Sequence, residues 1–186
     1  MRISDDRYNR DRIRFDLALR FIRHEARTHT IRIWTGLTDD RIRKLYRSYF
    51  PANGGVARRR GKSPQLASFF LRTPRMRHET AVLASMCYLY GVMPQERVAD
   101  APRRMPCAQR GEALCGAYET YRRLVPTSRI SLEHAIYLVT SLARGDELRP
   151  SHCADCWGLI VVDRFAVSGR RCRNCENWRH GKLLRR

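Results

Sequence analysis

Four cysteines near one end of the sequence constrain the fold of this chain most strongly. They form two Cys-x-x-Cys pairs, Cys153 with Cys156 and Cys172 with Cys175, and fifteen residues separate the pairs. This spacing is typical of a four-cysteine zinc site, in which each pair supplies two thiolates to a tetrahedral ion. Iron in a rubredoxin-like site uses the same ligands, and the spacing alone does not distinguish the two metals. A thioredoxin-like redox site fits less well, because it needs one pair at a strand-to-helix junction.

The residues between the two pairs predict how the pairs meet. Residues 159–162 (LIVV) are β-prone, Asp163 and Arg164 suit a turn, and residues 165–167 (FAV) suit a returning strand. We therefore expect a β-hairpin between the pairs that folds one pair onto the other. Four protein ligands leave no position for water, so we expect one structural zinc ion per chain and no zinc catalysis.

The rest of the sequence predicts helices, because apolar residues recur at helical spacing. Thr38 followed by Asp39 and Asp40 predicts a helix start with an N-cap and a favourable charge at the positive helix end. The expected helices cover 10–30, a segment starting near Asp39, 76–92, 111–125 and 131–143, and residues 100–109 are expected to form a loop.

These patterns together predict a mainly α protein with two parts. Residues 1–148 would form a helical domain for DNA or partner binding, with a helix-turn-helix-like segment. Residues 149–186 would form a small C-terminal four-cysteine, zinc-ribbon-like β-hairpin with a basic tail. The 43% hydrophobic content is sufficient for a packed core.

The charge of the chain indicates an anionic partner. Thirty-seven Lys and Arg residues face 18 Asp and Glu residues, which gives a formal net charge of +19. Nucleic acid is the commonest partner for such a positive field. Only three of the basic residues are lysines, and arginine binds phosphate and guanine through a bidentate fork. A GC-rich coding bias would produce the same preference, so the net charge carries this inference.

Two basic regions are candidates for contacting DNA. Residues 35–38 (TGLT) predict a tight turn between helices, and the next helix would enter the major groove as in a helix-turn-helix. A solvated basic helix is the alternative. The chain from Arg164 onward would act as a phosphate clamp, and arginines beside the second Cys pair would also offset about two negative charges on a zinc–thiolate cluster. The basic loop 58–64 (RRRGKSP) adds four more basic residues, and the candidate DNA contacts are Arg41, Arg43, Lys44, Arg47, Arg58, Arg59, Arg60, Lys62, Arg170, Arg171 and Arg173.

Enzyme and membrane signals are absent from the sequence. It contains no Gly-x-Ser-x-Gly, P-loop or Gly-x-Gly-x-x-Gly motif, and its carboxylates are too scattered to suggest a magnesium site. The N-terminal segment has no apolar signal region, and the longest uncharged run, 80–95, is too short to span a bilayer. We therefore expect a cytoplasmic protein that is not an enzyme, has no catalytic residues and does not bind membranes.

Several motifs occur in a fixed order along the chain. They are residues 35–47 (TGLTDDRIRKLYR), 60–64 (RGKSP), 69–74 (FFLRTP), 84–85 (AS), 117–121 (AYETY) and then the four cysteines. In this order they resemble the FlhC family of bacterial flagellar transcriptional regulators, over about residues 10–180. The run 35–47 together with the cysteine-containing tail is the most specific part of the resemblance.

The resemblance implies a DNA-binding transcriptional activator with zinc held by Cys153, Cys156, Cys172 and Cys175. The family acts as a hetero-oligomer in which the partner FlhD forms a ring with FlhC subunits around it. That complex binds double-stranded promoter DNA upstream of flagellar operons and recruits RNA polymerase. The chain departs from the family after Cys175, where 176–178 (ENW) replaces an expected proline-containing segment. The alternatives are a divergent paralogue, a zinc-ribbon nuclease and an RNA-binding protein.

Overall fold

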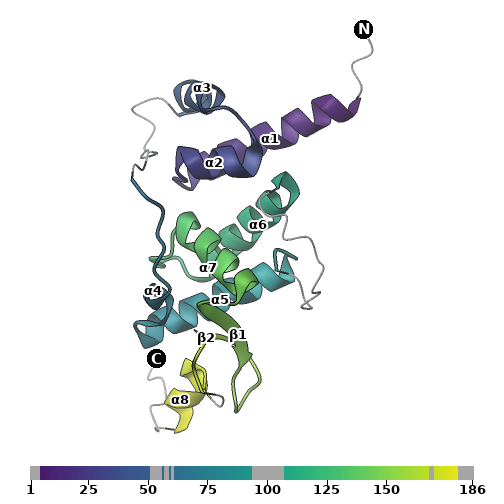
Figure 1. Cartoon of the computed structure of the whole chain (residues 1–186). Helices are drawn as coiled ribbons and strands as arrows, with labels where there is room; N and C mark the ends of the chain where they lie inside the picture. The colour runs from purple at the N-terminus through teal and green to yellow at the C-terminus, as the bar shows by residue number, and fades with distance from the viewer. Residues whose placement is uncertain are drawn as a thin grey trace.

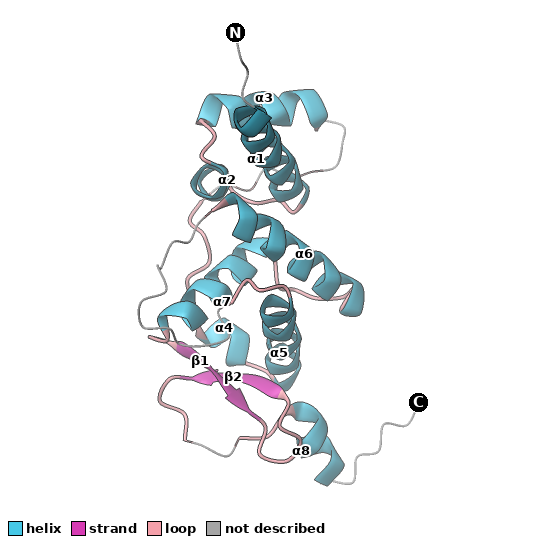
Figure 2. Ribbon diagram, turned by 90° about the vertical axis from the view of Figure 1, so that its right-hand side faces the viewer, coloured by secondary structure: helices cyan, strands magenta, loops and turns pink. Residues whose placement is uncertain are grey.

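The computed structural model describes residues 5–50, 56, 59, 61–93, 107–167 and 170–179. This part of the chain is mainly helical and ends in a two-stranded antiparallel hairpin, as the sequence predicts. Helices α1 to α3 lie at one end of the molecule, α5 to α7 in the middle, and the hairpin with α8 at the other end (Figures 1 and 2). The elements are α1 (Asp5–Arg23), α2 (Thr28–Thr35), α3 (Asp39–Tyr49), α4 (Ser68–Leu71), α5 (Pro74–Leu89), α6 (Ala108–Leu124), α7 (Leu132–Arg144), β1 (Leu148–His152), β2 (Leu159–Asp163) and α8 (Arg173–Arg179).

The single helix expected over residues 10–30 is two helices, α1 and α2. Glu25 has a left-handed backbone with φ of 56°. Its N–H donates to the carbonyl of Ile22 at 2.8 Å, and the N–H of Ala26 donates to the carbonyl of Phe21 at 2.9 Å. These two bonds are the Schellman arrangement that ends a helix, and buried Ala26 and Phe21 supply its apolar contact. Glycine usually marks this position, so glutamate gave no signal in the sequence.

The predicted turn between two helices is confirmed for α2 and α3. Gly36, with φ of 70°, ends α2, and its N–H donates to the carbonyl of Arg32 at 2.8 Å. Thr38 caps α3 as predicted, because its side chain accepts a hydrogen bond from the backbone N–H of Arg41. Ile42 and Leu45 are buried, which fixes the face that α3 turns toward α1 and α2.

Helices α5, α6 and α7 form the middle of the molecule. Thr73 and Ser131 cap α5 and α7 through their side chains, and α6 starts at Ala108 inside the range expected to be a loop. The rest of that expected loop, residues 100–106, lies outside the described residues. Helices α6 and α1 approach closely at Gly111, where a Cβ would lie 2.5 Å from Leu17 Cδ2.

One apolar core joins these helices. The largest fully buried side chains come from α1, α2, α3, α4, α5, α6, α7 and the turn before α7, so the core runs through all the long helices. They are Leu17, Phe21, Ile22, Ile31, Ile42, Phe70, Leu83, Leu114, Tyr121, Ile130, Leu132 and Leu138. No helix within the described ranges combines the length and hydrophobicity that a bilayer crossing requires.

The hairpin is present, but its strands differ from those expected. Strand β2 matches the β-prone run, and its partner is β1, which precedes the first Cys pair; Leu148 pairs with Asp163 and His152 with Leu159. Residues 165–167 form no strand, and the Phe165 side chain is 85% exposed. Strand β1 was missed because it contains Pro150, which a strand tolerates only where its missing N–H is not needed.

The hairpin packs directly on the helical core. Val161 of β2 and Leu148 of β1 belong to the same buried cluster as the helices, and β2 lies against α5. Ile160, Val162 and Cys153 form a second, smaller cluster on the other side of the hairpin. The division at residue 148 stays a prediction.

A four-cysteine candidate metal centre and its basic surroundings

Two different local structures bring the four cysteines together. Cys153 and Cys156 lie in the loop that joins β1 to β2, and Cys172 and Cys175 lie at the start of α8. The four sulfur atoms lie within 4.8 Å of one another. The expected ligand set is therefore assembled at one point, which is the end of the molecule farthest from α1 to α3 (Figure 2).

The sulfur geometry suits a metal ion with four thiolate ligands. A tetrahedral ion with metal–sulfur bonds of about 2.3 Å places its ligand sulfurs about 3.8 Å apart. The Cys156 and Cys172 sulfurs are 3.7 Å apart. Cys153 is buried, Cys172 and Cys175 are half-buried, and Cys156 is exposed, so the cluster lies at the surface with one thiol facing inward. These four residues could hold a metal ion, and its coordination would be complete without water.

Backbone hydrogen bonds shape the two turns that carry the cysteines, which we call the first knuckle (residues 153–158) and the second knuckle (residues 170–175). The Cys153 N–H donates to the carbonyl of Gly158, and the Trp157 N–H donates to the carbonyl of Cys153, which closes the first knuckle. Trp157 takes a left-handed φ of 60° in this turn. The Ala154 N–H donates to the carbonyl of Arg170 at 3.2 Å, so the two knuckles are joined by the main chain as well as by the sulfurs.

The Cys153 thiol is prepared for ionisation. Its burial opposes the thiolate, but backbone N–H groups of Cys156, Cys172 and Asp155 stabilise it and bring the pKa of Cys153 down to about 6. Burial raises the pKa of Cys172, and hydrogen bonding to the neighbouring thiols raises the pKa of Cys175. One thiolate therefore forms readily, and a bound cation would supply the stabilisation that the other thiols need to ionise.

The remaining cysteines take no part in this cluster. Cys87 and Cys115 are buried, as the apolar sequences around them indicate, and burial raises the pKa of each thiol to about 12. Cys107 is exposed in front of α6. Among the seven cysteines, only the C-terminal four are therefore placed so that together they could hold a metal ion.

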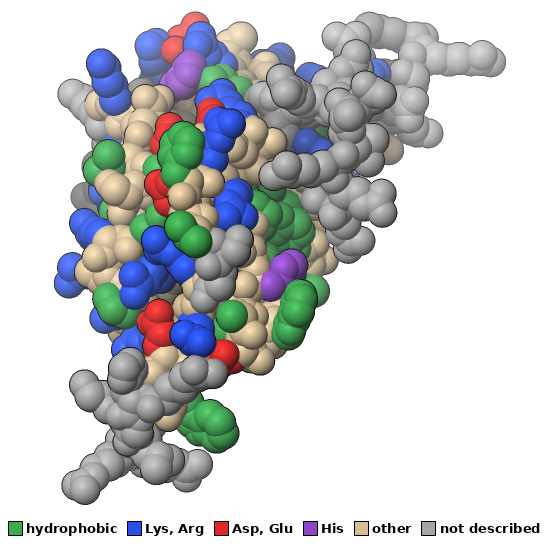
Figure 3. All heavy atoms as spheres, turned by 60° about the horizontal axis from the view of Figure 1, so that its bottom comes forward, with side chains coloured by type: hydrophobic (Ala, Val, Ile, Leu, Met, Phe, Trp, Pro, Cys, Tyr) green, Lys and Arg blue, Asp and Glu red, His purple; other side chains and the backbone are tan. Residues whose placement is uncertain are grey.

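Seven of the candidate DNA-contacting residues fall into two groups at opposite ends of the molecule, and Arg59 and Lys62 lie in the segment between α3 and α4. Arg41, Arg43, Lys44 and Arg47 are all exposed on α3, and Arg170, Arg171 and Arg173 are exposed beside the cysteine cluster. Figure 3 views the molecule toward the cluster end, where Lys and Arg side chains spread over the surface with carboxylates between them. The structure therefore does not bring the two groups into one patch. Arg58 and Arg60 lie outside the described residues.

Three of these basic side chains already have acidic partners. Arg43 donates to Asp40 at 3.0 Å, and Arg171 donates to Asp155 at 2.8 Å. Arg59 pairs with Glu25. All three pairs are at least partly exposed, so phosphate can compete with the carboxylates for the guanidinium groups. Lys62 is exposed.

A buried carboxylate anchors the basic segment that contains Lys62. Glu133 of α7 accepts hydrogen bonds from the backbone N–H of Arg27 at 2.8 Å and from the Ser63 hydroxyl at 2.7 Å. The Arg27 side chain also donates to the carbonyl of Gly61 at 3.1 Å. These contacts join residues far apart in the sequence, and the only sequence signal was an acidic residue among the apolar residues of α7.

The sequence reasoning also missed the acidic residue within the first Cys pair. Asp155 lies between Cys153 and Cys156, and its carboxylate binds Arg171 next to the second pair. The sequence did contain a signal for this contact, because an acidic residue lies inside one Cys pair and arginines lie beside the other. This ion pair joins the knuckles independently of the sulfur atoms.

The fold and the site define a class of protein. The chain is a mainly helical protein with a small hairpin that carries a four-cysteine candidate metal centre. No protein-family model matches the chain, and no curated protein matches it either.

Proposed function

We propose that this chain is a DNA-binding transcriptional activator of the FlhC type whose C-terminal region is stabilised by a structural zinc ion. It would act in a hetero-oligomer with an FlhD-like partner, bind promoter DNA of flagellar operons and recruit RNA polymerase. The sequence resemblance supports the partner, the operons and the polymerase. The arrangement of the basic residues supports DNA binding, and the cysteine geometry supports the metal.

The helix α3 carries the DNA-binding part of the proposal. Its Ile42 and Leu45 are buried against the neighbouring helices, while Lys44 and Arg47 are exposed and have no acidic partner within the described part of the chain. The turn before it is capped on both sides, by Gly36 and Thr38. A helix held in this way can present its basic face to a DNA groove without changing its packing.

Zinc is the metal that the four cysteines fit best. Four thiolates are the ligand set of structural zinc sites, the four sulfurs lie within 4.8 Å of one another, and the 3.7 Å between the Cys156 and Cys172 sulfurs matches tetrahedral spacing. Zinc bound in this way supplies folding energy and no redox chemistry. Zinc held by the four cysteines would then stabilise the loop between β1 and β2 and the start of α8. The protein would not use this site for catalysis.

A DNA-binding assay tests the proposal. Fluorescence anisotropy with labelled duplex DNA is expected to show affinity that falls steeply between about 50 and 200 mM salt, because phosphate contacts release counterions. The double variant Lys44→Gln/Arg47→Gln should bind more weakly and lose about two from the salt slope. Arg23→Gln/Arg123→Gln is the matched control, because it removes the same charge and both residues are exposed outside the proposed surface, on α1 and α6. Equal affinity of the double variant and the control would remove α3 from the interface.

Two further arms separate the alternatives and test the partner. Labelled RNA as competitor separates duplex DNA binding from RNA binding, and incubation with Mg²⁺ would reveal a nuclease through cleavage of the probe. Co-expression with an FlhD-like protein, followed by light scattering and binding to flagellar promoter DNA, tests the hetero-oligomer. Separate elution of the two proteins would contradict the proposed partner.

A further inference from the structure

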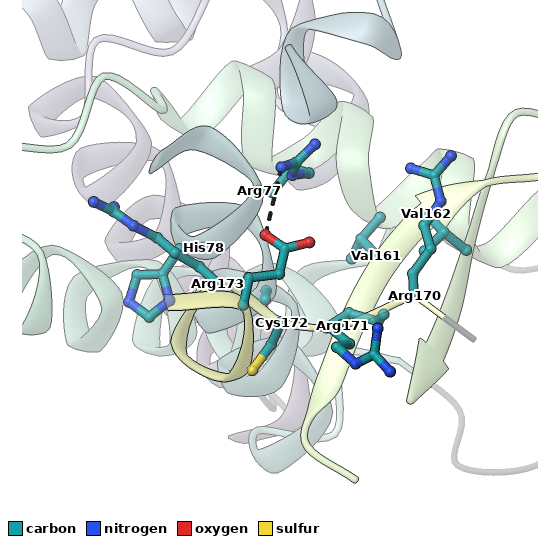
Figure 4. Close-up of a pocket in the computed structure, with 11 residues that line it drawn as sticks. Arg77, His78, Val161, Val162, Arg170, Arg171, Cys172 and Arg173 are labelled. Carbon is teal, nitrogen blue, oxygen red and sulfur yellow. Dashed lines mark ion pairs between the residues drawn. The ribbon is translucent and has the colours of Figure 1, made fainter. Parts of the chain in front are cut away.

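A cleft lies between α5 and the cysteine-bearing module, by which we mean the hairpin of β1 and β2 together with residues 170–179. It has a volume of about 60 Å³, and its floor includes Val161 and Val162 of β2. Its walls come from three separate places in the sequence: the first turns of α5, the segment before Cys172, and α8. Figure 4 shows these side chains around the ion pair that crosses the cleft. A space of this size holds a few water molecules, which suits a small polar group rather than a large ligand.

The side chains lining this cleft are strongly basic. Arg77 and His78 come from α5, and Arg170, Arg171 and Arg173 come from the module opposite. The only carboxylate among the lining residues is that of Glu176, on α8. Four of the lining side chains therefore carry a guanidinium group and one carries a carboxylate, so arginines outnumber carboxylates in the lining whatever the state of His78.

Carboxylates of the protein neutralise little of this positive charge. Arg170, Arg173 and His78 have no acidic partner among the residues that the structure describes, whereas Arg171 is paired with Asp155 outside the cleft. Arg77 and Glu176 approach only to 3.9 Å, and their side chains are 40% and 43% exposed. An ion pair that is this long and this exposed is weak, so an incoming anion can replace the carboxylate at Arg77.

We propose that this cleft binds a phosphate group, with Arg77 as the central donor and Glu176 as a built-in competitor. Arginine presents a planar fork that matches two phosphate oxygens, and the cleft brings such groups from both of its walls. Glu176 occupies Arg77 when the cleft is empty and weakens binding of any anion. The phosphate belongs either to the backbone of a nucleic acid or to a free phosphate; its assignment to DNA rests on the proposed function, whereas phosphate binding itself does not.

The cleft also explains a feature that the cysteine cluster alone leaves unexplained. The arginines beside Cys172 could neutralise the thiolates of a metal cluster, but Arg77 and His78 lie on a different element and add to the same positive region. A phosphate bound here would touch α5 and the module together. It would therefore hold the metal-bearing end of the molecule against the helical core.

Titration of the full-length zinc-loaded protein with inorganic phosphate tests the proposal directly. NMR of the arginine side-chain N–H groups and the His78 ring is expected to show saturating shifts at Arg77 and His78 that chloride at equal ionic strength does not produce. Arg77→Gln should weaken phosphate binding at least about threefold, and Glu176→Gln should strengthen it by a similar factor. Arg23→Gln, an equal loss of charge at the far end of the molecule, should change it little.

The opposite signs of the two cleft variants keep the test decisive even if one variant folds poorly. Shifts that chloride reproduces, or equal weakening by Arg77→Gln and Arg23→Gln, would overturn the cleft site in favour of a general field effect. A Glu176→Gln protein that is folded and binds phosphate no more tightly would overturn the competitor role.

A DNA arm identifies the source of the phosphate. If the nucleic-acid backbone fills the cleft, Arg77→Gln should reduce the salt slope of DNA binding by about one, and Glu176→Gln should increase DNA affinity. Phosphate binding with an unchanged DNA salt slope would assign the cleft to a free phosphate. If the wild-type protein binds phosphate but no DNA, the proposed function fails and the cleft site stands.

Discussion

Asp155 and Arg171 join the two cysteine pairs through their side chains. The Arg171 Nε–H donates to Asp155 Oδ2 at 2.8 Å, and the Arg171 and Asp155 side chains are 39% and 25% exposed, respectively. Because Asp155 lies between two of the cysteines and Arg171 precedes a third, the pair fixes the relative position of both knuckles. This contact should prearrange the thiols before a metal binds.

Asp155→Asn should therefore weaken metal binding without changing its stoichiometry. An ion pair at this level of exposure is worth up to about 1 kcal/mol, so we expect a loss of affinity of up to about fivefold in competition with a chelator. Arg171→Gln should give the same loss. The double variant should be no weaker than either single variant if both changes act on metal binding through their shared ion pair. Fully additive losses would show that the pair does not act as a unit.

Loss of a cysteine ligand should have a far larger effect. Cys153→Ser removes the buried ligand, and we expect the protein to lose its bound zinc and the folded structure of the hairpin and α8. Metal analysis and hydrogen exchange of the C-terminal amides measure the two effects. Cys107→Ser is the matched control, because Cys107 is exposed and lies outside the cluster. Purified wild-type protein without zinc or iron would contradict the metal assignment.

The parts of the fold that the sequence predicted depend on local signals. The two Cys pairs, the Thr38 cap and the β-prone run of β2 each lie within a short segment, and all three are found in the structure. The parts that it missed depend on unusual local residues. Glu25 ends α1 where glycine is typical, and Pro150 occupies a strand in which proline is rare.

The rest of the candidate site could not be predicted because it depends on distant contacts. Arg77 meets Glu176 from a remote part of the sequence, and Ser63 meets Glu133 across three intervening helices. Neither pair has a spacing or motif that marks it in the sequence. The basic residues could be counted in advance, but which of them face one another is set by how α5 and α7 pack.

Glu133 should be among the most important single residues for stability outside the apolar core. Its side chain is 3% exposed and accepts hydrogen bonds from Arg27 and Ser63. Glu133→Ala would leave those donors without a partner, and we expect it to lower the free energy of unfolding by about 2–4 kcal/mol. Urea denaturation measures this loss. Asp16→Ala, at an exposed position on α1 with only a 4.0 Å ion pair to Arg12, is the control, and an equal loss in both variants would contradict the role of Glu133.

His134 should make the stability of the protein depend on pH. Burial lowers its pKa, and the nearby positive charges of Arg27 and Arg72 lower it further, against the opposing effect of Glu133. The ring stacks on Phe69 at 4.2 Å between centroids. Its Nδ1 lies 2.7 Å from the Ser131 hydroxyl in the capping box of α7. Protonation would place a half-buried positive charge at this cap.

The sign of the effect follows from the lowered pKa. Above the ordinary histidine pKa of about 6.5, His134 is neutral in both the folded and the unfolded chain, and its contribution to stability is constant. As the pH falls below that value, the unfolded chain takes up the proton first, so the free energy of unfolding decreases until the folded histidine is also protonated. Wild-type protein should therefore lose stability between about pH 7 and 5.

The variant His134→Asn should show a shallower loss over the same range, since asparagine does not titrate. Urea denaturation at about pH 7, 6 and 5 measures the slopes, and His29→Asn, at an exposed position on α2, is the control. Metal binding also weakens in acid, but all three proteins keep the four cysteines, so the differences between them at each pH report the histidines. Parallel curves for wild type and His134→Asn would show that the lowered pKa of His134 does not contribute to acid sensitivity.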